Sequence, residues 1–404
     1  MPDTDEMKLS LSRLREPLYA ANPYALYQRL RTADPVHWDE RGSWVLTRYV
    51  DVVAALRDPR LSAERFSLDV SGLPEEVQRP VSALSRQMLF LDPPDHTHLR
   101  ALTAKAFTPR VVEAMRFSIQ CIVDELLDAL EDRGNFDVIS ELAFPLPAIV
   151  IAQMLGVPPE DRLQFARWTA AFGALLDGTL LDVIGLPEAL TRVSALMDYF
   201  RHIIAGRRKA PRDDLLQALL NAEEQGDTLS EDELLGNCVL LLAAGHGTTT
   251  HLIGNGLLAL LQHPDQLEEL RQTPELIGPA VVELLRYDSP VQMTGRFVRE
   301  DLELAGKPIR AGQHVLACLG AANRDPEQFP DPDRLDLHRQ AGKQVAFGHG
   351  IHYCLGAPLA RLEAEIALNT LLRRFPALRL ESETLTWMDS LVFRGLRELP
   401  VSIQ

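Results

Sequence analysis

The chain has 404 residues, of which 46% are hydrophobic and 24% charged, a composition typical of a globular protein with a large buried core. Its 41 Lys and Arg against 57 Asp and Glu give a net charge of −16, which argues against a general binder of nucleic acids or anionic membranes. The four cysteines lie far apart without a C-x-x-C spacing, so the sequence predicts neither a disulfide framework nor a zinc site, and a reducing cytoplasm fits best.

The first part of the chain shows short alternating elements. The N-terminus is polar and acidic, unlike a signal peptide, and no apolar run approaches the roughly 18 residues of a membrane helix, so we expect no membrane anchor. The pattern predicts a helix over 24–30, strands over 36–38 and 43–46, and a helix over 49–56.

Residues 61–91 mix Ser, Gly, Pro and charges with scattered apolar side chains, Phe90 among them. This composition predicts a long surface connection. Connections of this length in compact proteins are often lids or binding loops.

A helix is predicted after the paired prolines 93 and 94. His96 and Arg100 are four residues apart on it and share one face, which suits the binding of an anionic group. A solvated polar face is the other interpretation of the pair.

Residues 111–208 show a succession of helical patterns, with Phe172 in a crowded apolar stretch near the middle. These side chains are either core or part of a moving lid.

Ser230 and Glu233 form a capping-box pattern at the start of the most apolar long helix of the chain, which includes Leu242 and runs to about residue 261. Its centre, residues 243–250, reads Ala-Ala-Gly-His-Gly-Thr-Thr-Thr. Glycine and back-bonding threonine weaken a helix, so we expect a local kink or widened turn there.

Further on, Glu283 and Arg286 share a helix face, a spacing that in most proteins marks only an exposed pair. A strand is predicted over 291–298, short strands near 309 and over 314–317, and a proline-rich meander over 325–336. The tail, including 391–395, also reads as strands.

Cys354 lies in a glycine-rich loop that runs into a helix with Pro358 in its first turn. A position ahead of a helix N-terminus favours a thiolate over a thiol. By itself, a buried and inert thiol is the more common interpretation of a lone cysteine.

The pattern Phe347-x-x-Gly350-x-His352-x-Cys354-x-Gly356 resembles the haem-binding loop of the cytochrome P450 superfamily, in which the cysteine thiolate is the axial iron ligand. Matches also occur, in the family's order, at the His96–Arg100 pair, residues 244–249, the Glu283–Arg286 pair and Arg334. The resemblance implies a mainly α fold with a smaller β region, as a single domain over 1–404. It places the β-rich part mainly at 35–60, 291–317 and 376–404, and haem b between the long central helix and the cysteine loop.

The resemblance implies a role for each matching residue. Cys354 is the metal ligand, and Phe347, Gly348, His352 and Gly356 form the loop around it. The propionates of the haem would bind His96, Arg100, Arg296 and His352. Arg334 would complete a buried triad with Glu283 and Arg286. Candidates for the substrate pocket are Phe90, Phe172, Leu242, Val291, Met293, Leu391 and Val392.

The oxygen-binding helix departs from the family pattern at one position. Ala244 and Thr248 match, but Gly247 stands where the family usually has an acid, which together with the alcohol organises the water that delivers protons. His246 is a candidate substitute, although its neighbouring position turns it about 100° away. Solvent entering beside Gly247 is the alternative.

The activity implied by the resemblance is insertion of one oxygen atom from O2 into a C–H or C=C bond of a medium-sized lipophilic substrate. Electrons would come from ferredoxin and a ferredoxin reductase. Two alternatives remain: peroxide-driven oxygenation or a redox-independent isomerase or dehydratase on the same fold, and a non-catalytic haem-thiolate sensor.

Overall fold

The computed structural model describes residues 9–64, 75–158, 161, 168, 179–212, 215–224, 230–382 and 384–403. Phe172, a predicted pocket residue, lies outside them. Contacts within the chain form two compact units. Unit 1 comprises Met1–Arg65, Gly254–Cys354 and Ser382–Leu399, and unit 2 comprises Phe66–Ile253, Leu355–Glu381 and Pro400–Gln404.

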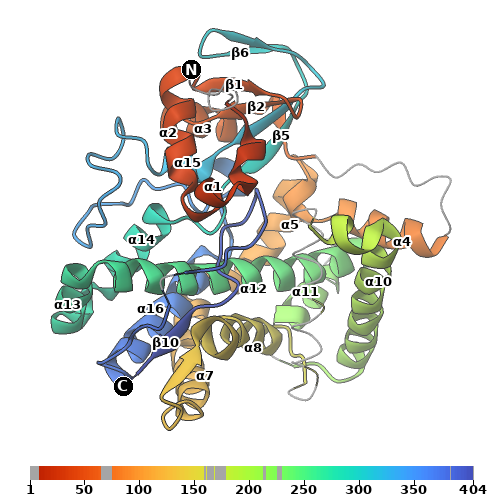
Figure 1. Ribbon diagram of the computed structural model, residues 1–404. Coiled ribbons are helices and arrows are strands. Elements are labelled where there is room, and N and C mark those ends of the chain that lie inside the picture. Colours follow the sequence, from red (N-terminus) through yellow and green to blue (C-terminus); the bar gives the residue numbers. More distant parts are fainter. Residues whose placement is uncertain are drawn as a thin grey trace. The chain divides into compact units, whose positions relative to one another are not determined.

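Unit 1 is built on a five-stranded sheet in the order β1-β2-β8-β5-β3. The strands are β1 (Val36–Asp39), β2 (Ser43–Leu46), β8 (His314–Ala317), β5 (Thr294–Val298) and β3 (Leu61–Ser62). β2 pairs parallel with β8, whereas the other three pairings are antiparallel. The strands predicted over 36–38, 43–46 and 314–317 are confirmed. A two-stranded hairpin of β6 (Leu302–Leu304) and β7 (Lys307–Ile309) extends from this region (Figure 1).

The helices of unit 1 follow local start signals in the sequence. Asn22 accepts a hydrogen bond from the Tyr24 amide (3.2 Å) and Pro23 occupies the first turn, so α2 begins there, as predicted. The predicted helix at 49–56 is also confirmed. The elements are η1 (Leu11–Arg15), α1 (Pro17–Ala21), α2 (Pro23–Ala33), α3 (Tyr49–Arg57), α13 (Pro264–Gln272), η6 (Pro274–Leu276), α14 (Ile277–Tyr287), α15 (Leu319–Ala322) and η7 (Gly350–His352).

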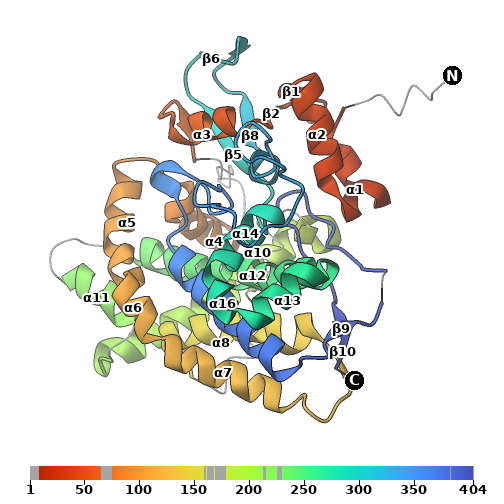
Figure 2. The ribbon, with the colours of Figure 1, turned by 90° about the vertical axis from the view of Figure 1, so that its left-hand side faces the viewer.

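Unit 2 is mainly helical. Its helices are α4 (Glu75–Ser85), η2 (Met88–Phe90), α5 (Asp95–Ala104), η3 (Lys105–Phe107), α6 (Pro109–Ala114), α7 (Arg116–Asp128), the π-helical turn η4 (Ile139–Ala143), α8 (Pro145–Met154), α10 (Thr179–Lys209), α11 (Leu215–Glu224) and α16 (Ala357–Arg374). Helices α7 and α16 lie side by side (Figures 1 and 2) and are joined by a hydrogen bond from Gln120 to Thr370 (3.1 Å). A small sheet in the order β4-β10-β9 joins β4 (Asn135–Asp137), β10 (Pro400–Ser402) and β9 (Arg379–Leu380).

The long apolar helix is α12 (Glu231–Gln262). Its predicted capping box is confirmed, because the Ser230 hydroxyl accepts from the Glu233 amide (3.2 Å) and the Glu233 carboxylate accepts from the Ser230 amide (2.8 Å). The helix continues without interruption through the glycines and threonines, contrary to the expected widened turn. Thr248 and Thr250 instead donate to the carbonyls of Ala244 (2.7 Å) and His246 (3.1 Å) within the intact helix.

The prediction of a long surface connection over 61–91 is wrong for the part that the structure describes. Residues 75–90 form α4 and η2, and their apolar side chains, including Val81, Leu84 and Met88, are buried. A Cβ on Gly236 of α12 would lie 2.2 Å from the Ala83 carbonyl oxygen, so α4 packs directly against that helix. The apolar residues of this segment are spaced too irregularly for the sequence to distinguish a buried helix from a loop.

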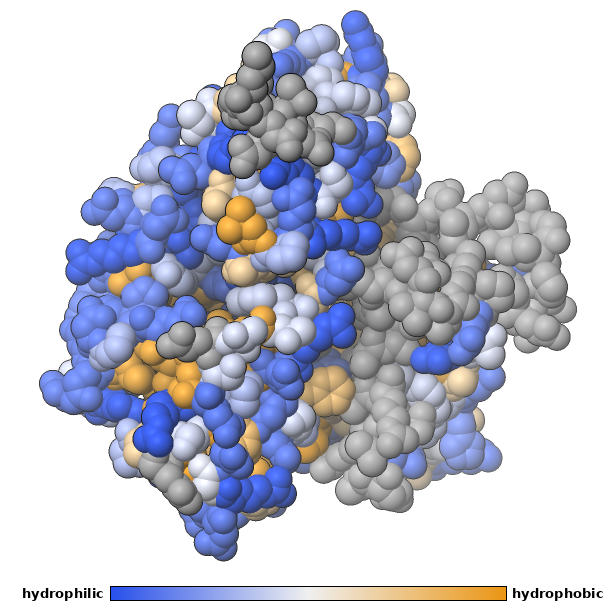
Figure 3. Space-filling model, in the orientation of Figure 1, coloured by the Kyte–Doolittle hydropathy of each residue, from blue (hydrophilic) through white to orange (hydrophobic). Residues whose placement is uncertain are grey.

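The tail also differs from its prediction. Residues 387–396 form only isolated bridges, Trp387 with Leu396 and Val291 with Phe393, and regular strands occur at β9 and β10. Hydrophilic residues dominate the face shown in Figure 3. Among the described residues, none of the helices combines the length and the apolar character that a membrane span requires.

One buried acid on α16 predicts a pH dependence. Burial raises the pKa of Glu363 to about 8, so the folded chain keeps a proton that the unfolded chain releases above about pH 4.5. Stability therefore falls as pH rises from about 5 to 8, by up to about 1.4 kcal/mol per pH unit. Glu363→Gln has no such proton, so in urea unfolding its stability relative to the wild type should increase over that range. If the stability difference between Glu363→Gln and the wild type were the same at pH 5 and at pH 8, a neutral Glu363 would be contradicted.

Candidate active site

Cys354 closes a short loop whose backbone is hydrogen-bonded to itself. Its amide donates to the Phe347 carbonyl (2.9 Å), and the Tyr353 amide donates to the Gly350 carbonyl (3.1 Å). The thiol is half-buried, and α16 begins three residues later in the chain with Pro358 in its first turn. The loop and helix predicted around this cysteine are confirmed.

Two glycines give the loop its shape. Gly348 and Gly350 both have φ of +73°, a conformation that other residues adopt at a cost. A Cβ on Gly350 would lie 2.5 Å from the backbone oxygen of Leu56 at the end of α3, whereas one on Gly348 would approach nothing closer than 3.9 Å among the described residues. Gly350 therefore allows the loop to rest directly on α3.

The base of the loop is held by a single asparagine. Asn323, fully buried, accepts from the Val345 amide (2.7 Å) through its side chain and donates to the Ser289 hydroxyl (2.9 Å). Its own carbonyl accepts from Arg286 (2.9 Å). The cysteine loop is thus connected to the Glu283–Arg286 pair through Asn323.

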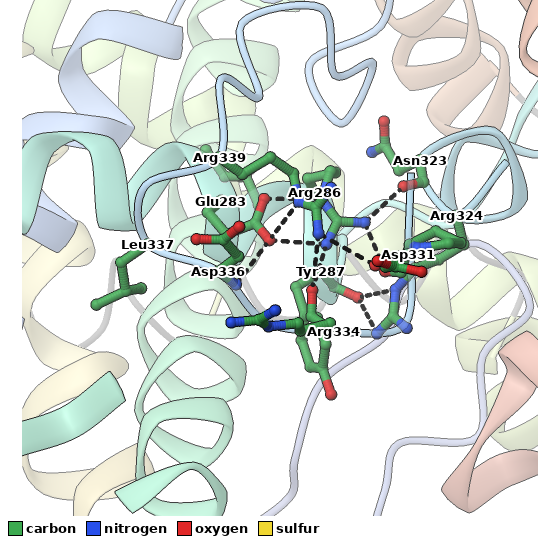
Figure 4. A network of polar contacts seen from close by, with 12 residues as sticks. Glu283, Arg286, Tyr287, Asn323, Arg324, Asp331, Arg334, Asp336, Leu337 and Arg339 are labelled. Atoms are coloured by element: carbon green, nitrogen blue, oxygen red, sulfur yellow. Dashed lines mark hydrogen bonds and ion pairs between the residues drawn. The ribbon is translucent and has the colours of Figure 1, made fainter. Parts of the chain in front are cut away.

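Glu283 and Arg286 form a fully buried ion pair, with both side chains at 0% exposure. Arg286 donates to the two carboxylate oxygens at 2.7 and 2.8 Å, and its remaining nitrogen bonds the carbonyls of Asn323 (2.9 Å) and Pro332 (2.8 Å). The backbone amide of Asp336 also donates to Glu283 (3.2 Å). The backbone of Asn323, Pro332 and Asp336 is therefore hydrogen-bonded to this one pair of side chains (Figure 4).

The third member of this network is Arg339 and not Arg334. The Arg339 guanidinium donates to Glu283 (3.1 Å) and to the carbonyls of Pro330 and Asp331. Arg334 is exposed and contributes only its carbonyl, which accepts from Arg286 (3.3 Å). The prediction for Arg334 is wrong because the meander has no regular repeat from which the inward-facing arginine can be counted.

This difference predicts opposite outcomes for two arginine substitutions. Arg339→Met removes a donor from a buried carboxylate and should destabilise the protein by roughly 1.5–3 kcal/mol. Arg334→Met leaves the carbonyl in place and should change stability by no more than about 0.5 kcal/mol. Chemical unfolding compares the two, with Glu283→Ala as the upper limit at roughly 3–5 kcal/mol. A larger loss of unfolding free energy for Arg334→Met than for Arg339→Met would support Arg334 as the third member of the triad.

The strand leading away from α14 carries other predicted residues. Arg296 is buried on β5 and donates to the Gly295 carbonyl (2.8 Å). Val291 is half-buried against the core of unit 1. Met293 is 3% exposed and belongs to a second core cluster with the tyrosines of α1 and α2, and its place in the substrate pocket stays a prediction. The Val392 carbonyl accepts from the Gln292 amide (2.7 Å), and Leu391 packs beside that second cluster.

His96 and Arg100 both lie on α5, four residues apart, as predicted. His96 is buried, and burial together with the positive charge of Arg100 lowers its pKa. A carboxylate bound to both would offset these two effects, since an anion favours the protonated imidazole. The pair therefore has the charge that an anionic group requires.

The centre of α12 is open at its glycines. The exposed Ala244 accepts from the half-buried Thr248, and no described atom lies within 4 Å of a Cβ placed on Gly247 or Gly245. Leu242, by contrast, is 0% exposed in the interior of unit 2, and Phe90 is also buried. The helix therefore has room for a larger side chain at the position where the family usually has an acid.

His246 is not placed to replace that acid. Its Nε2 lies 2.9 Å from the Phe144 carbonyl oxygen, and its ring packs edge-on against the Phe144 ring at 4.3 Å. Burial lowers its pKa to about 4, so the imidazole is neutral at pH 7. The helical turn between neighbouring residues directs His246 into the packing of α12 against the segment before α8.

Asn323 and Arg339, which hold the loop and the ion pair, were not predicted. Asn323 occurs in Ala-Ala-Asn-Arg-Asp, where neither spacing nor periodicity distinguishes it from a turn residue. Only the tertiary contact reveals its role.

The two loop glycines allow a matched test. Gly348→Ala should cost about 1–2 kcal/mol because of its left-handed backbone alone. Gly350→Ala has the same backbone cost and also displaces the Leu56 carbonyl. It should therefore destabilise the protein more than Gly348→Ala and leave a smaller fraction of the purified protein with bound haem. Urea unfolding and the absorbance of the purified variants measure both. Equal effects would show that the contact with α3 has no energetic role.

The donor set fits a haem. Cys354 is half-buried, and a cysteine thiolate is one of the side chains that hold haem iron. Among the described residues, no group of three or more His, Cys, Asp and Glu side chains could hold a metal ion. Arg296, His96 and Arg100 provide cationic donors of the kind that bind carboxylates.

Comparisons with known proteins agree with this assignment. The family model for cytochrome P450 matches residues 67–389. Cytochrome P450 107B1 of Saccharopolyspora erythraea is 45% identical, covering 99% of this chain and 98% of its own. Vitamin D(3) 25-hydroxylase of Pseudonocardia autotrophica is 43% identical, with 95% and 94% covered. The crystal structure of P450BioI in complex with an acyl carrier protein carrying hexadec-9Z-enoic acid superimposes with a TM-score of 0.90 at 41% identity, covering 96% of this chain and 100% of that one. The chain belongs to the cytochrome P450 family.

Proposed function

We propose that this P450 monooxygenase inserts one oxygen atom from O2 into a C–H or C=C bond of a medium-sized lipophilic molecule. Ferredoxin and a ferredoxin reductase would supply the electrons in the cytoplasm. The observation that carries the proposal is the conformation of Cys354, on a loop shaped by Gly348 and Gly350 and tied to the Glu283–Arg286 pair.

Cys354 would hold the haem iron, and the basic residues would bind the propionates. Haem with a thiolate ligand supplies oxygen activation, because the thiolate favours O–O cleavage. Arg296, His96, Arg100 and His352 would bind the carboxylates through charge-assisted hydrogen bonds. Phe347, Gly348 and Gly356 would shape the loop around the sulfur, whose potential depends on nearby hydrogen bonds.

Thr248 would position a water molecule for proton transfer. Its hydroxyl proton is donated to Ala244, which leaves the oxygen lone pairs to accept from water. No carboxylate occurs on α12 after Glu233, and His246 is neutral and buried against Phe144. Protons would therefore come from solvent that occupies the space beside Gly247.

The proposed substrate class is supported by the apolar residues near the expected pocket and by the relatives. One relative is named as a hydroxylase of vitamin D(3), and one structure holds a hexadecenoic acid on a carrier protein. Both molecules are largely apolar. Val291, Leu391 and Val392 are among the described residues that would contact such a substrate.

A second activity on the same fold is favoured by Gly247. Oxygenation by hydrogen peroxide converts RH and H2O2 to ROH and H2O, so it needs no electrons from ferredoxin and no net uptake of protons from solvent. An isomerase or dehydratase reaction would likewise need no electrons. A catalytically silent haem-thiolate sensor would bind ligands without forming any product.

Turnover separates these activities. The purified enzyme is tested with a panel of fatty acids, steroids and macrolides, either with O2, NADPH and redox partners or with hydrogen peroxide alone. Product that requires NADPH supports the monooxygenase, and product only with peroxide supports the alternative. A reduced carbon monoxide complex without the absorption of a thiolate-ligated haem would contradict the role of Cys354.

The open position at 247 predicts a gain of function. Gly247→Asp restores a proton carrier, so the product formed per NADPH consumed should rise several-fold, which is less than the roughly 10²–10⁴-fold by which a positioned acid or base accelerates a proton-transfer step. Gly245→Asp is the matched control, because it adds the same carboxylate in equally open space on the same helix. Equal coupling in both variants would contradict a specific proton role for position 247.

A further inference from the structure

The segment 387–395 includes Leu391 and Val392, two of the residues that the proposed function places at the substrate. It has no regular strand and makes one isolated bridge to Val291. A cavity of about 260 Å³ separates part of it from Tyr19 and Tyr27 of the N-terminal helices. This volume is below the roughly 300–1,000 Å³ that is typical of ligand pockets. Close packing on that side therefore does not hold the segment in place.

One side chain holds the segment from three directions. Arg394 donates to the Asp288 carboxylate (2.7 Å) and to the carbonyls of Ala20 and Ala21 at the end of α1 (2.8 Å each). Its guanidinium also lies 3.6 Å from the centre of the Trp387 ring, in the same segment. All the donor nitrogens of the fork are therefore used, and their acceptors come from separate parts of unit 1.

The backbone of Arg394 links this side chain to the residues that are expected to contact substrate. Its amide donates to the Pro290 carbonyl (2.8 Å), and its carbonyl accepts from Asn255 of α12 (3.0 Å). Two residues away, the Gln292 amide donates to the Val392 carbonyl (2.7 Å). A shift of Arg394 would therefore move both 391–393 and 290–292.

The acceptor of Arg394 is itself fixed. The Asp288 oxygen that Arg394 contacts also accepts from the Tyr24 hydroxyl (2.7 Å). Burial and the charge of Asp288 raise the pKa of Tyr24, so the phenol keeps its proton and remains a donor. Arg324 stacks over the Tyr24 ring at 4.3 Å and adds positive charge near this carboxylate.

We propose that Arg394 is a positioning residue that sets the substrate wall formed by Val291 and residues 391–393, and thereby the width of the pocket and the site of oxidation. A buried ion pair alone would serve stability and leave the product unchanged. Arg394 differs from such a pair because its backbone is hydrogen-bonded to the substrate wall, while its side chain is hydrogen-bonded to Asp288 and to the end of α1. The proposal rests on the proposed function only for the site of oxidation.

The test compares Arg394→Met with Arg31→Met in the haem-loaded protein. Arg31 is a matched control, since it also donates to two backbone carbonyls, of Ala321 and Arg324, and lies near Asp325, but it does not touch the wall. Tyr24→Phe is a milder second variant that removes only the phenol hydroxyl from Asp288.

The probes are imidazole and 4-phenylimidazole, which offer the iron the same nitrogen and differ by a phenyl ring that must fit the pocket. Their dissociation constants come from the Soret shift. For Arg394→Met we expect the ratio of the two constants to change about tenfold, because displacements far from the chemistry carry effects of up to about 100-fold. Tyr24→Phe should change the ratio in the same direction by less, and Arg31→Met should leave it unchanged.

Hydrogen exchange provides a second measurement that needs no ligand. The amides of Gln292 and of residue 394 should lose protection in Arg394→Met and keep it in Arg31→Met. An unchanged ratio with unchanged protection in folded Arg394→Met would overturn the proposal. If that variant does not retain haem, an unchanged ratio in Tyr24→Phe overturns it instead. Failure of the wild type to form product with O2 would contradict the proposed function, yet both of these measurements would still decide the role of Arg394.

Discussion

The buried ion pair of Glu283 and Arg286 is the interaction on which the rest of unit 1 depends. Two charges removed completely from water are tolerated only if every donor and acceptor is satisfied. Here that requirement draws in the carbonyls of Asn323, Pro332 and Arg334, the amide of Asp336 and the guanidinium of Arg339. Through Asn323 it also reaches Val345, at the start of the cysteine loop. The conformation of the Cys354 loop is thus linked, through Asn323, to the charge satisfaction of a pair of side chains outside the loop.

Local chemistry was predictable from the sequence, and tertiary pairing was not. The capping box at Ser230, the helix start at Pro23 and the glycine loop around Cys354 each depend on residues within a few positions of one another, and the structure bears them out. The choice of Arg339 over Arg334 depends on how an irregular meander folds back. Met293 similarly occurs in a run that alternates correctly for a strand, but the sequence does not tell which face meets the second core cluster.

The family resemblance identified positions, and the structure changed what two of them imply. His246 lies in the glycine-rich centre of α12, yet its ring is committed to Phe144 and neutral. The same observation makes the missing acid at Gly247 more important, because the titratable side chain of His246 does not replace it. Under the proposed function, this chain would therefore separate two roles that usually occur together, because it keeps the alcohol of Thr248 and would take its protons from solvent.

The bonds from Arg394 to Ala20 and Ala21 give the N-terminal helices a role beyond covering the sheet. The last carbonyls of a helix carry partial negative charge and need donors, and α1 obtains them from the opposite end of the sequence. Trimming the chain past residue 21 would leave two guanidinium N–H groups without acceptors, although nothing close to the sulfur would be deleted. If Arg394 positions the substrate wall as proposed, substitutions at the end of α1 would alter substrate selectivity through this arginine.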